Sequence, residues 1–296
     1  MKVAVCFFGH LRTFKRCSVY IKRNLLKYYD CDLFMHTWSE YNHKTKTWHE
    51  NKEIKGHVSK EEIIKIYGEF KDLVVEEQII EDLGFITVDI DKIEMSLFGL
   101  KSMYHSMKTS FDLCKQYSIR NNITYDYVIM IRPDIVILEK FDLDKYISVL
   151  KDDEINKAFM TVGNNILPIS CGFKYLKAID LFYWGRPKVI LDVLHNLPNI
   201  INNLSQNRVI KTSPEFKLVE LIKSLGYTLY EVKYSSWKII RPLKRKDWIK
   251  QIIRIKVRKN YIKIHLLEYI LIKIFSIRIN LLNFEIDCCI GRSYSE

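Results

Sequence analysis

Two short polar turns in this chain of 296 residues carry side chains suited to binding phosphate or metal. The first is Gly9-His10-Leu11-Arg12-Thr13, and the second is Arg132-Pro133-Asp134. An arginine fork can contact two phosphate oxygens, and a carboxylate can hold a divalent cation against a diphosphate. A glycine lets the backbone approach a ligand closely. The residues predicted to bind a phosphorylated ligand are therefore Gly9, His10, Arg12, Thr13, Arg132 and Asp134, with Asp134 also the predicted metal ligand.

Each turn also has a purely structural interpretation. The first could be an ordinary strand-to-helix turn with Arg12 in solvent. In the second, Arg132 could pair with Asp134 in a salt bridge at a strand end. For the second turn the binding interpretation is favoured, because its two charges interrupt a sequence that is apolar on both sides.

Strong hydrophobic patterns place both turns at strand ends. Residues 3–8 and 127–131 are unbroken apolar runs, which are typical of parallel strands buried on both faces. A helical pattern over residues 14–29 and a strand pattern over 31–37 complete a β-α-β unit at the start of the chain. Ligands of open parallel sheets bind at the carboxyl ends of the strands, where both turns lie.

The remaining patterns extend the same architecture. Further strands are expected at 74–75, 85–90, 135–138, 158–161, 179–184 and 227–232. Further helices are expected at 59–70, 94–118, 187–196 and 214–225. These alternating elements predict an α/β fold, Rossmann-like, with a mostly parallel sheet flanked by helices.

Composition narrows the class of protein. The formal net charge of +12 favours anionic partners, namely nucleic acid, anionic lipid or phosphorylated small molecules. Seven scattered cysteines without a C-x-x-C pair indicate a reduced, cytoplasmic protein, and no apolar run is long enough for a membrane span. His36, His43, His49 and His57 lack a metal-ligand spacing and are interpreted as surface residues.

The end of the chain differs from the rest. Residues 244–296 contain 12 Lys and Arg against 5 Asp and Glu, so they carry +7 of the net charge. We expect a domain over residues 1–243 and a basic amphipathic helical extension over 244–296. Its part 244–280 could lie on an anionic membrane surface, or the extension could pack on the domain with its basic face in solvent. No nucleic-acid-binding motif accompanies the charge.

The order of the motifs carries a family resemblance. Gly9-His10-Leu11-Arg12-Thr13-Phe14, Asp32 to Trp38 and Tyr125 to Asp134 resemble GT-A-type glycosyltransferases of bacterial capsule and lipopolysaccharide clusters, with the WavE-like group the nearest. Asp180-Leu181-Phe182-Tyr183-Trp184-Gly185 and Ser213 to Leu218 continue it. The resemblance implies a GT-A-like domain that binds a nucleotide-sugar donor. Arg132 stands where these enzymes place the first Asp of Asp-x-Asp, which leaves a Mn²⁺ or Mg²⁺ requirement open.

The resemblance implies a glycosyltransferase that moves a sugar onto a surface polysaccharide or lipid-linked glycan, inside the cell or at the inner face of the cytoplasmic membrane. If the reaction inverts the anomeric centre, a carboxylate must deprotonate the acceptor. Asp180 and Glu215 are the candidates, with Asp180 favoured because the first turn of a helix explains Glu215. Two alternatives remain: a non-catalytic protein that binds nucleic acid or an anionic surface, and a transferase of another group in the same pathway.

Overall fold

The apolar run near the N-terminus forms β1 (Lys2–Phe8), a central strand of the main sheet. It pairs in parallel with β2 (Asp30–Trp38) on one side and with β6 (Tyr127–Ile131) on the other. The computed structural model describes residues 1–42, 56–89, 93–163, 167–168, 179–210, 214–234 and 236–240, and the strands at 253–258, 261–266 and 285–290. It divides into two compact units, Met1–Arg241 and Pro242–Glu296.

The main sheet is mixed but mostly parallel. The described strands lie in the order β3 (Asp72–Glu76), β2, β1, β6, β10 (Phe182–Gly185), β8 (Ala158–Gly163), β12 (Thr228–Lys233) and β9 (Leu167–Pro168). β10 and β9 run antiparallel to their neighbours. The chain proceeds from β1 outward through β2 to β3 and then returns to the other side of β1 as β6. The strand order therefore reverses between β1 and β6, which makes this the topological switch point of the sheet.

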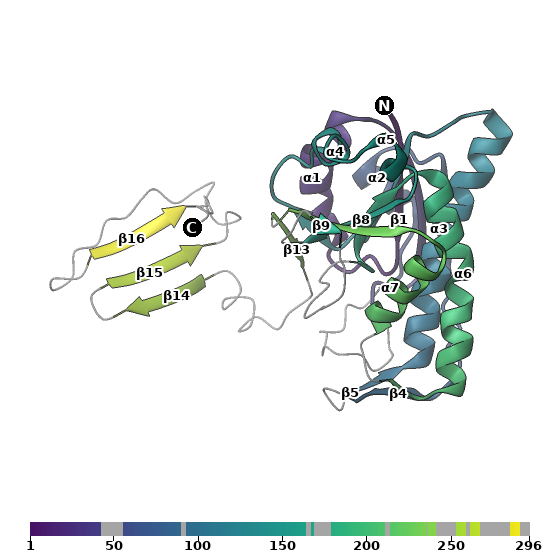
Figure 1. Cartoon of the computed structure of the whole chain (residues 1–296). Coiled ribbons are helices and arrows are strands. Elements are labelled where there is room, and N and C mark those ends of the chain that lie inside the picture. The colour runs from purple at the N-terminus through teal and green to yellow at the C-terminus, as the bar shows by residue number, and fades with distance from the viewer. Residues whose placement is uncertain are drawn as a thin grey trace. The chain divides into compact units, whose positions relative to one another are not determined.

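Helices lie on both faces of this sheet (Figure 1). The helices of the first unit are α1 (Phe14–Asn24), the 3₁₀ helix η1 (Leu26–Tyr28), α2 (Lys60–Tyr67), α3 (Leu97–Asn121), α4 (Leu143–Ile147), α5 (Asp152–Ile155), α6 (Pro187–Gln206) and α7 (Pro214–Ser224). The predicted α/β fold with a mostly parallel sheet flanked by helices is confirmed.

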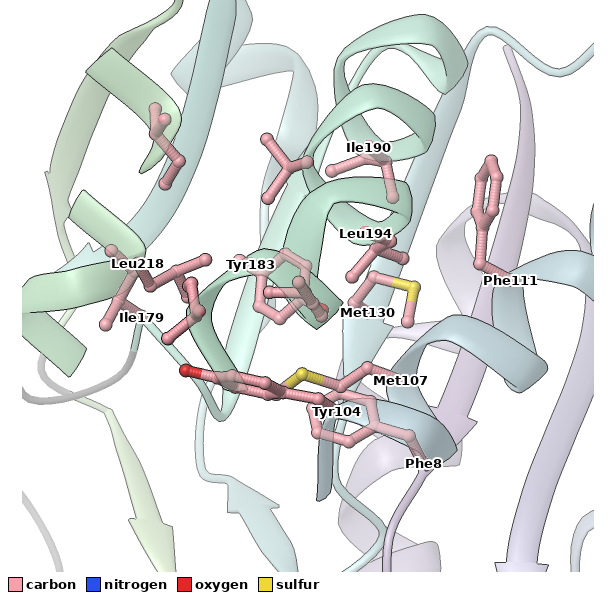
Figure 2. Packing of buried hydrophobic residues seen from close by; sticks show 14 of the residues in the cluster. Phe8, Tyr104, Met107, Phe111, Met130, Ile179, Tyr183, Ile190, Leu194 and Leu218 are labelled. Carbon is pink, nitrogen blue, oxygen red and sulfur yellow. The ribbon is translucent and has the colours of Figure 1, made fainter. Parts of the chain in front are cut away.

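The side chains of β1 alternate between two hydrophobic clusters. Val5 and Phe7 enter a cluster with residues of α1 and α2. Cys6 and Phe8 enter a cluster with residues of α3, α6 and α7. Figure 2 shows part of the second cluster, in which Met130 of β6 lies among side chains from these helices. Burial on both faces explains why the run has no polar residue.

Two smaller sheets accompany the main one among the described residues of the first unit. β4 (Phe85–Val88) pairs with β5 (Ile93–Ser96) and with β11 (Val209–Ile210). β7 (Ile135–Ile137) pairs with β13 (Trp237–Ile239) and so leaves the main sheet after β6. The break falls at Pro133, which has no N–H for a sheet ladder. The turn Arg132-Pro133-Asp134 therefore connects two sheets.

α6 is longer than its sequence pattern predicts. It continues through Pro198 to Gln206, although proline removes one intrahelical hydrogen bond. Leu197, Ile200 and Leu204 are buried in the second hydrophobic cluster. Their packing offsets the local cost of the proline, so tertiary contacts outweigh helix propensity here.

The helical extension predicted for the basic segment is wrong for the residues that the structure describes there. These form β14 (Ile253–Arg258), β15 (Tyr261–Leu266) and β16 (Glu285–Ile290), with β14 and β15 antiparallel and β15 and β16 parallel. Residues 253–258 read Ile-Arg-Ile-Lys-Val-Arg, and this alternation has the period of a strand and is rich in β-branched residues. The remaining residues of 244–296 lie outside the described part.

α3 begins at a side-chain cap that can be tested. Ser96 Oγ accepts a hydrogen bond from the N–H of Gly99 at 3.2 Å. We expect Ser96→Ala to lower the free energy of unfolding by about 1 kcal/mol, measured by urea denaturation. Ser96→Asp keeps the acceptor and should remain close to the wild type. Equal losses in both variants would show that the cap contributes nothing.

Candidate functional site

A buried charge cluster joins the two turns that the sequence singled out. Asp134 is fully buried, and its Oδ1 accepts a hydrogen bond from Arg132 Nε at 2.9 Å. Its Oδ2 accepts from Arg132 Nη2 and, at 2.9 Å, from Arg12 Nη1. Arg12 Nε also donates to Asn42 Oδ1 at 3.1 Å. The cluster lies at the switch point between β1 and β6, where open α/β sheets bind their ligands.

The electrostatics of this cluster follow from its burial and pairing. Burial opposes the charged carboxylate, but Arg132 and Arg12 outweigh it and lower the pKa of Asp134 to about 2. For Arg132, burial acts to lower the pKa, but the charge and hydrogen bonds of Asp134 and the charge of Asp180 raise it overall. All three groups are therefore ionised at neutral pH. Two guanidinium groups and one carboxylate give these three residues a net charge of +1, and Asp180 adds a further negative charge that acts on Arg132.

Asp134 is also the predicted ligand of a divalent cation, and that role stays a prediction, because the structure shows its carboxylate in ion pairs. Both carboxylate oxygens already accept hydrogen bonds from guanidinium groups. A metal ion at Asp134 would have to displace them and would stand beside two positive charges. Arg132 and Asp134 form the expected salt bridge, and Arg12 pairs with the same carboxylate. The positive charge available to a ligand comes from the arginines.

The backbone around Arg12 is strained in a way typical of functional turns. Arg12 has a φ of 43°, in the left-handed region that non-glycine residues rarely adopt. Its N–H donates to the carbonyl of Tyr41 at 2.9 Å, which holds the turn in place. α1 starts directly afterwards, so the positive end of its dipole lies at this turn. No acidic residue occurs in the first turn of the helix.

The other residues predicted in the first turn have different partners. Gly9 has a φ of 87°, and its N–H donates to Ser106 Oγ at 2.7 Å. The His10 ring lies beside Trp38, and its Nδ1 is 3.1 Å from the carbonyl oxygen of Glu40. The Thr13 hydroxyl donates to the carbonyl of Ile240. Of the first turn, Arg12 contacts the second turn through Asp134.

The two predicted acceptor-side carboxylates lie near a shared tyrosine. Tyr104 of α3 is buried, and Figure 2 shows its hydroxyl pointing to the side where Ile179 and Leu218 lie. Burial raises the pKa of the Tyr104 hydroxyl, and the charges of Asp180 and Glu215 raise it further. The charge of Asp180 also raises the pKa of Arg132, so Asp180 acts on both the charge cluster and Tyr104. Sequence patterns did not single out Tyr104, which reads as one apolar position of an amphipathic helix.

One histidine interpretation is wrong, and the error reveals a second group of polar residues. His36 was expected at the surface, but its side chain is fully buried on β2. It lies with Glu76 of β3 and His105 of α3 in a group with metal-ligand potential. Burial lowers the pKa of His36 more than Glu76 raises it. His57 is exposed, whereas His43 and His49 lie outside the described residues.

Two solved structures are distantly similar to this chain. No protein-family model and no curated protein matches the sequence. The structure is similar to a nucleoside-diphosphate-sugar pyrophosphorylase from Vibrio cholerae RC9, with 10% identity, a TM-score of 0.36, and coverage of 84% of this chain and 98% of that chain. It is also similar to a glycosyltransferase involved in the glycosylation of the major capsid of PBCV-1, with 9% identity, a TM-score of 0.26, and coverage of 79% and 94%. Both TM-scores are too low to assign a shared activity or to place a site residue.

The charge cluster predicts an acid-dependent stability. Asp134→Asn removes the negative charge between two buried arginines and should lower the free energy of unfolding at neutral pH by about 3–5 kcal/mol. The folded-state pKa of about 2 lies below the ordinary 3.8, so the stabilisation by wild-type Asp134 is present above the ordinary value and is lost as pH falls toward 2. The wild type and the variant should therefore differ less in free energy of unfolding as the pH falls. The difference should shrink by about 2 kcal/mol from roughly pH 4 to pH 2, measured by urea denaturation.

Asp144→Asn is the matched control, because Asp144 is an exposed aspartate on α4. It should leave the unfolding free energy nearly unchanged at each pH. If the difference between Asp134→Asn and the wild type stays constant over this range, Asp134 is not the ionised centre of the cluster.

Proposed function

We propose that this protein is a nucleotide-sugar-dependent glycosyltransferase whose donor diphosphate binds at the switch point between β1 and β6. The observation that carries the proposal is the meeting of Arg12 and Arg132 at that point, beside the N-terminus of α1. Guanidinium groups and a helix N-terminus both favour phosphate. The resemblance to WavE-like glycosyltransferases supports it, because two of its motifs supply the turns that carry Arg12 and Arg132 after β1 and β6.

In this proposal the donor and acceptor sides use different residues. Gly9 and Arg12 of the first turn and Arg132 of the second hold the diphosphate, and Asp134 orients both arginines. His10 and Thr13 shape the first turn through their backbone contacts. No metal ion is assigned to Asp134. Whether the transfer uses Mn²⁺ or Mg²⁺ is a separate question, because the two arginines can stabilise part of the charge on the leaving diphosphate.

The proposed reaction inverts the anomeric centre. The carboxylate of Asp180 takes the proton of the acceptor hydroxyl, and the freed oxygen attacks the anomeric carbon. The bond from that carbon to the donor phosphate breaks, and the nucleoside diphosphate leaves with the electron pair. Arg12 and Arg132 stabilise its added negative charge. Glu215, whose charge acts on Tyr104 as that of Asp180 does, serves acceptor binding.

The acceptor in this proposal is a surface polysaccharide or a lipid-linked glycan. Among the described residues, no helix has the length and apolarity needed to cross a bilayer. Residues 244–296 carry +7, and a basic segment of this size is attracted to anionic lipid. We propose peripheral binding at the inner face of the cytoplasmic membrane through charge attraction. The strands in this segment no longer favour an inserted amphipathic helix.

A transfer assay with a panel of nucleotide sugars tests the activity. We expect Asp180→Asn to lower kcat by about 100-fold or more while nucleoside diphosphate affinity stays unchanged, because a base acts on the acceptor only. Arg12→Gln should instead weaken nucleoside diphosphate binding, measured by calorimetry. Asp144→Asn is the control for both readouts. Full activity of Asp180→Asn would remove its assigned role.

The same assay separates the proposal from its alternatives. A non-catalytic protein that binds anionic polymers would show no nucleoside diphosphate binding and a steep loss of nucleic-acid binding with added salt. A transferase of another group would bind a nucleotide but give an acceptor product whose mass lacks a glycosyl increment. Either result would contradict glycosyl transfer.

Membrane binding is tested by truncation. A chain ending at Pro242 lacks the charge of 244–296 and should bind vesicles with anionic lipid much more weakly than the full chain, measured by co-sedimentation. Added salt should weaken binding of the full chain, because the attraction is screened. Equal vesicle binding by both chains would show that residues 1–242 and not the basic segment bind the membrane.

A further inference from the structure

Three side chains from separate elements converge beside the first turn. His36 lies on β2, Glu76 is the last residue of β3, and His105 lies on α3. Glu76 Oε2 is 2.8 Å from His36 Nε2 and 3.0 Å from His105 Nε2. One ligand atom from each residue lies within 4.8 Å of the other two. Two imidazole nitrogens therefore face a single carboxylate oxygen.

The surroundings of His36 indicate which of its nitrogens carries a proton. Ser106 Oγ accepts from the N–H of Gly9 at 2.7 Å and is 3.2 Å from the carbonyl oxygen of His36, to which it donates. It is also 2.8 Å from His36 Nδ1. A serine hydroxyl has one proton and two acceptor positions. All three contacts are hydrogen bonds only if Nδ1–H donates to Oγ.

This tautomer gives the neutral ring a lone pair at Nε2. That lone pair points at Glu76 Oε2 at a distance of 2.8 Å, and Oε2 is itself an acceptor. Two acceptors at this distance repel each other unless a proton or a cation lies between them. A metal ion bound by both groups removes the repulsion.

We propose that His36, Glu76 and His105 bind one Zn²⁺ ion, or a late first-row transition metal ion with the same ligand preference. Two imidazoles and one carboxylate suit zinc, whereas Mg²⁺ and Ca²⁺ prefer oxygen ligands alone. This site is separate from Asp134. The inference does not depend on the proposed glycosyl transfer, because metal binding can be measured without any reaction.

The spacing of the group is close to that of a zinc site. Bonds of about 2.0–2.1 Å to the ion place tetrahedral ligands roughly 3.3 Å apart. The two observed contacts, 2.8 Å and 3.0 Å, need to widen by only a few tenths of an ångström. The side chains of His105 and Glu76 are 47% and 42% exposed, so solvent reaches the group. With three protein ligands, the ion keeps a position for water or a substrate oxygen.

The neighbours of the group can hold it in place. Ser106 bonds Nδ1 of His36, which is the second-shell contact that orients a metal-binding histidine. Trp38 stacks on the His105 ring, with centroids 5.6 Å apart, and packs edge-on to His36. Through Ser106 the group is also joined to Gly9 of the first turn. Metal binding can therefore affect the conformation of that turn.

The experiment uses the full chain after treatment with a chelator and dialysis. Titration with Zn²⁺ in competition with a chromophoric chelator should show one bound Zn²⁺ ion whose binding requires His36, Glu76 and His105. Zn²⁺ should also raise the thermal unfolding temperature of the protein. His105→Ala and Glu76→Gln change half-exposed side chains and should lose this ion. Ser106→Ala should weaken its binding by about 10- to 100-fold. His195→Ala is the control, because His195 is a half-exposed histidine on α6 that contacts Asp112 at 3.2 Å.

Co²⁺ provides a readout specific to the place of binding. Bound Co²⁺ should quench the fluorescence of Trp38, and the quenched component should be absent from Trp38→Phe and from His105→Ala. Unchanged Zn²⁺ stoichiometry and affinity in both His105→Ala and Glu76→Gln would overturn the proposal, since the ion would then bind elsewhere, for example at cysteine. Absence of Zn²⁺ binding by the wild type would overturn it as well, and the group would be a hydrogen-bonded cluster only.

Discussion

Asp134 is a fully buried carboxylate that holds two arginine side chains from different parts of the chain, and the geometry of the candidate site depends on this arrangement. An isolated charge would be very costly in this position, so each of the three groups requires the other two. The ion pairs join the turn after β1 to the turn after β6. The N–H of Ile240 also donates to the carbonyl of Asp134, which attaches the end of β13 to the same point. The arginines are thus positioned before any ligand binds.

A second set of contacts starts from α3 and serves the other side of the first turn. Ser106 forms hydrogen bonds with the backbone of Gly9 and with the ring of His36. The preceding residue, His105, contacts Glu76. Tyr104, one position earlier, lies near Asp180. Three consecutive residues of α3 therefore reach the first turn, the histidine group and the acceptor-side carboxylates. The helix can do this because it packs on the sheet along β1, β2 and β3. A shift of α3 would change the first turn, the histidine group and the carboxylates together.

The turns and the strands before them could be predicted because their signals are local. An apolar run with no polar residue indicates a strand covered on both faces, and a proline next to two charges indicates where the ladder stops. The cap of α2 at Ser59 and the left-handed Asn122 at the end of α3 follow from single residue types in the same way. The same kind of local signal was misread in residues 253–258, where the alternation of a strand was given less weight than the basic charge.

The sequence by itself determined the class of the fold and the presence of two polar turns at the ends of its buried strands, because hydrophobic period and turn chemistry act over a few residues. Only the tertiary structure decided which polar groups meet. Arg12 and Asp134 are 122 positions apart, and His36 and Glu76 are 40 positions apart. Their contacts depend on strand order and register, which place distant residues at one edge of the sheet. That is why Asp134 reads as a metal-ligand candidate in the sequence, whereas the fold makes it the partner of two arginines and brings His36, Glu76 and His105 together.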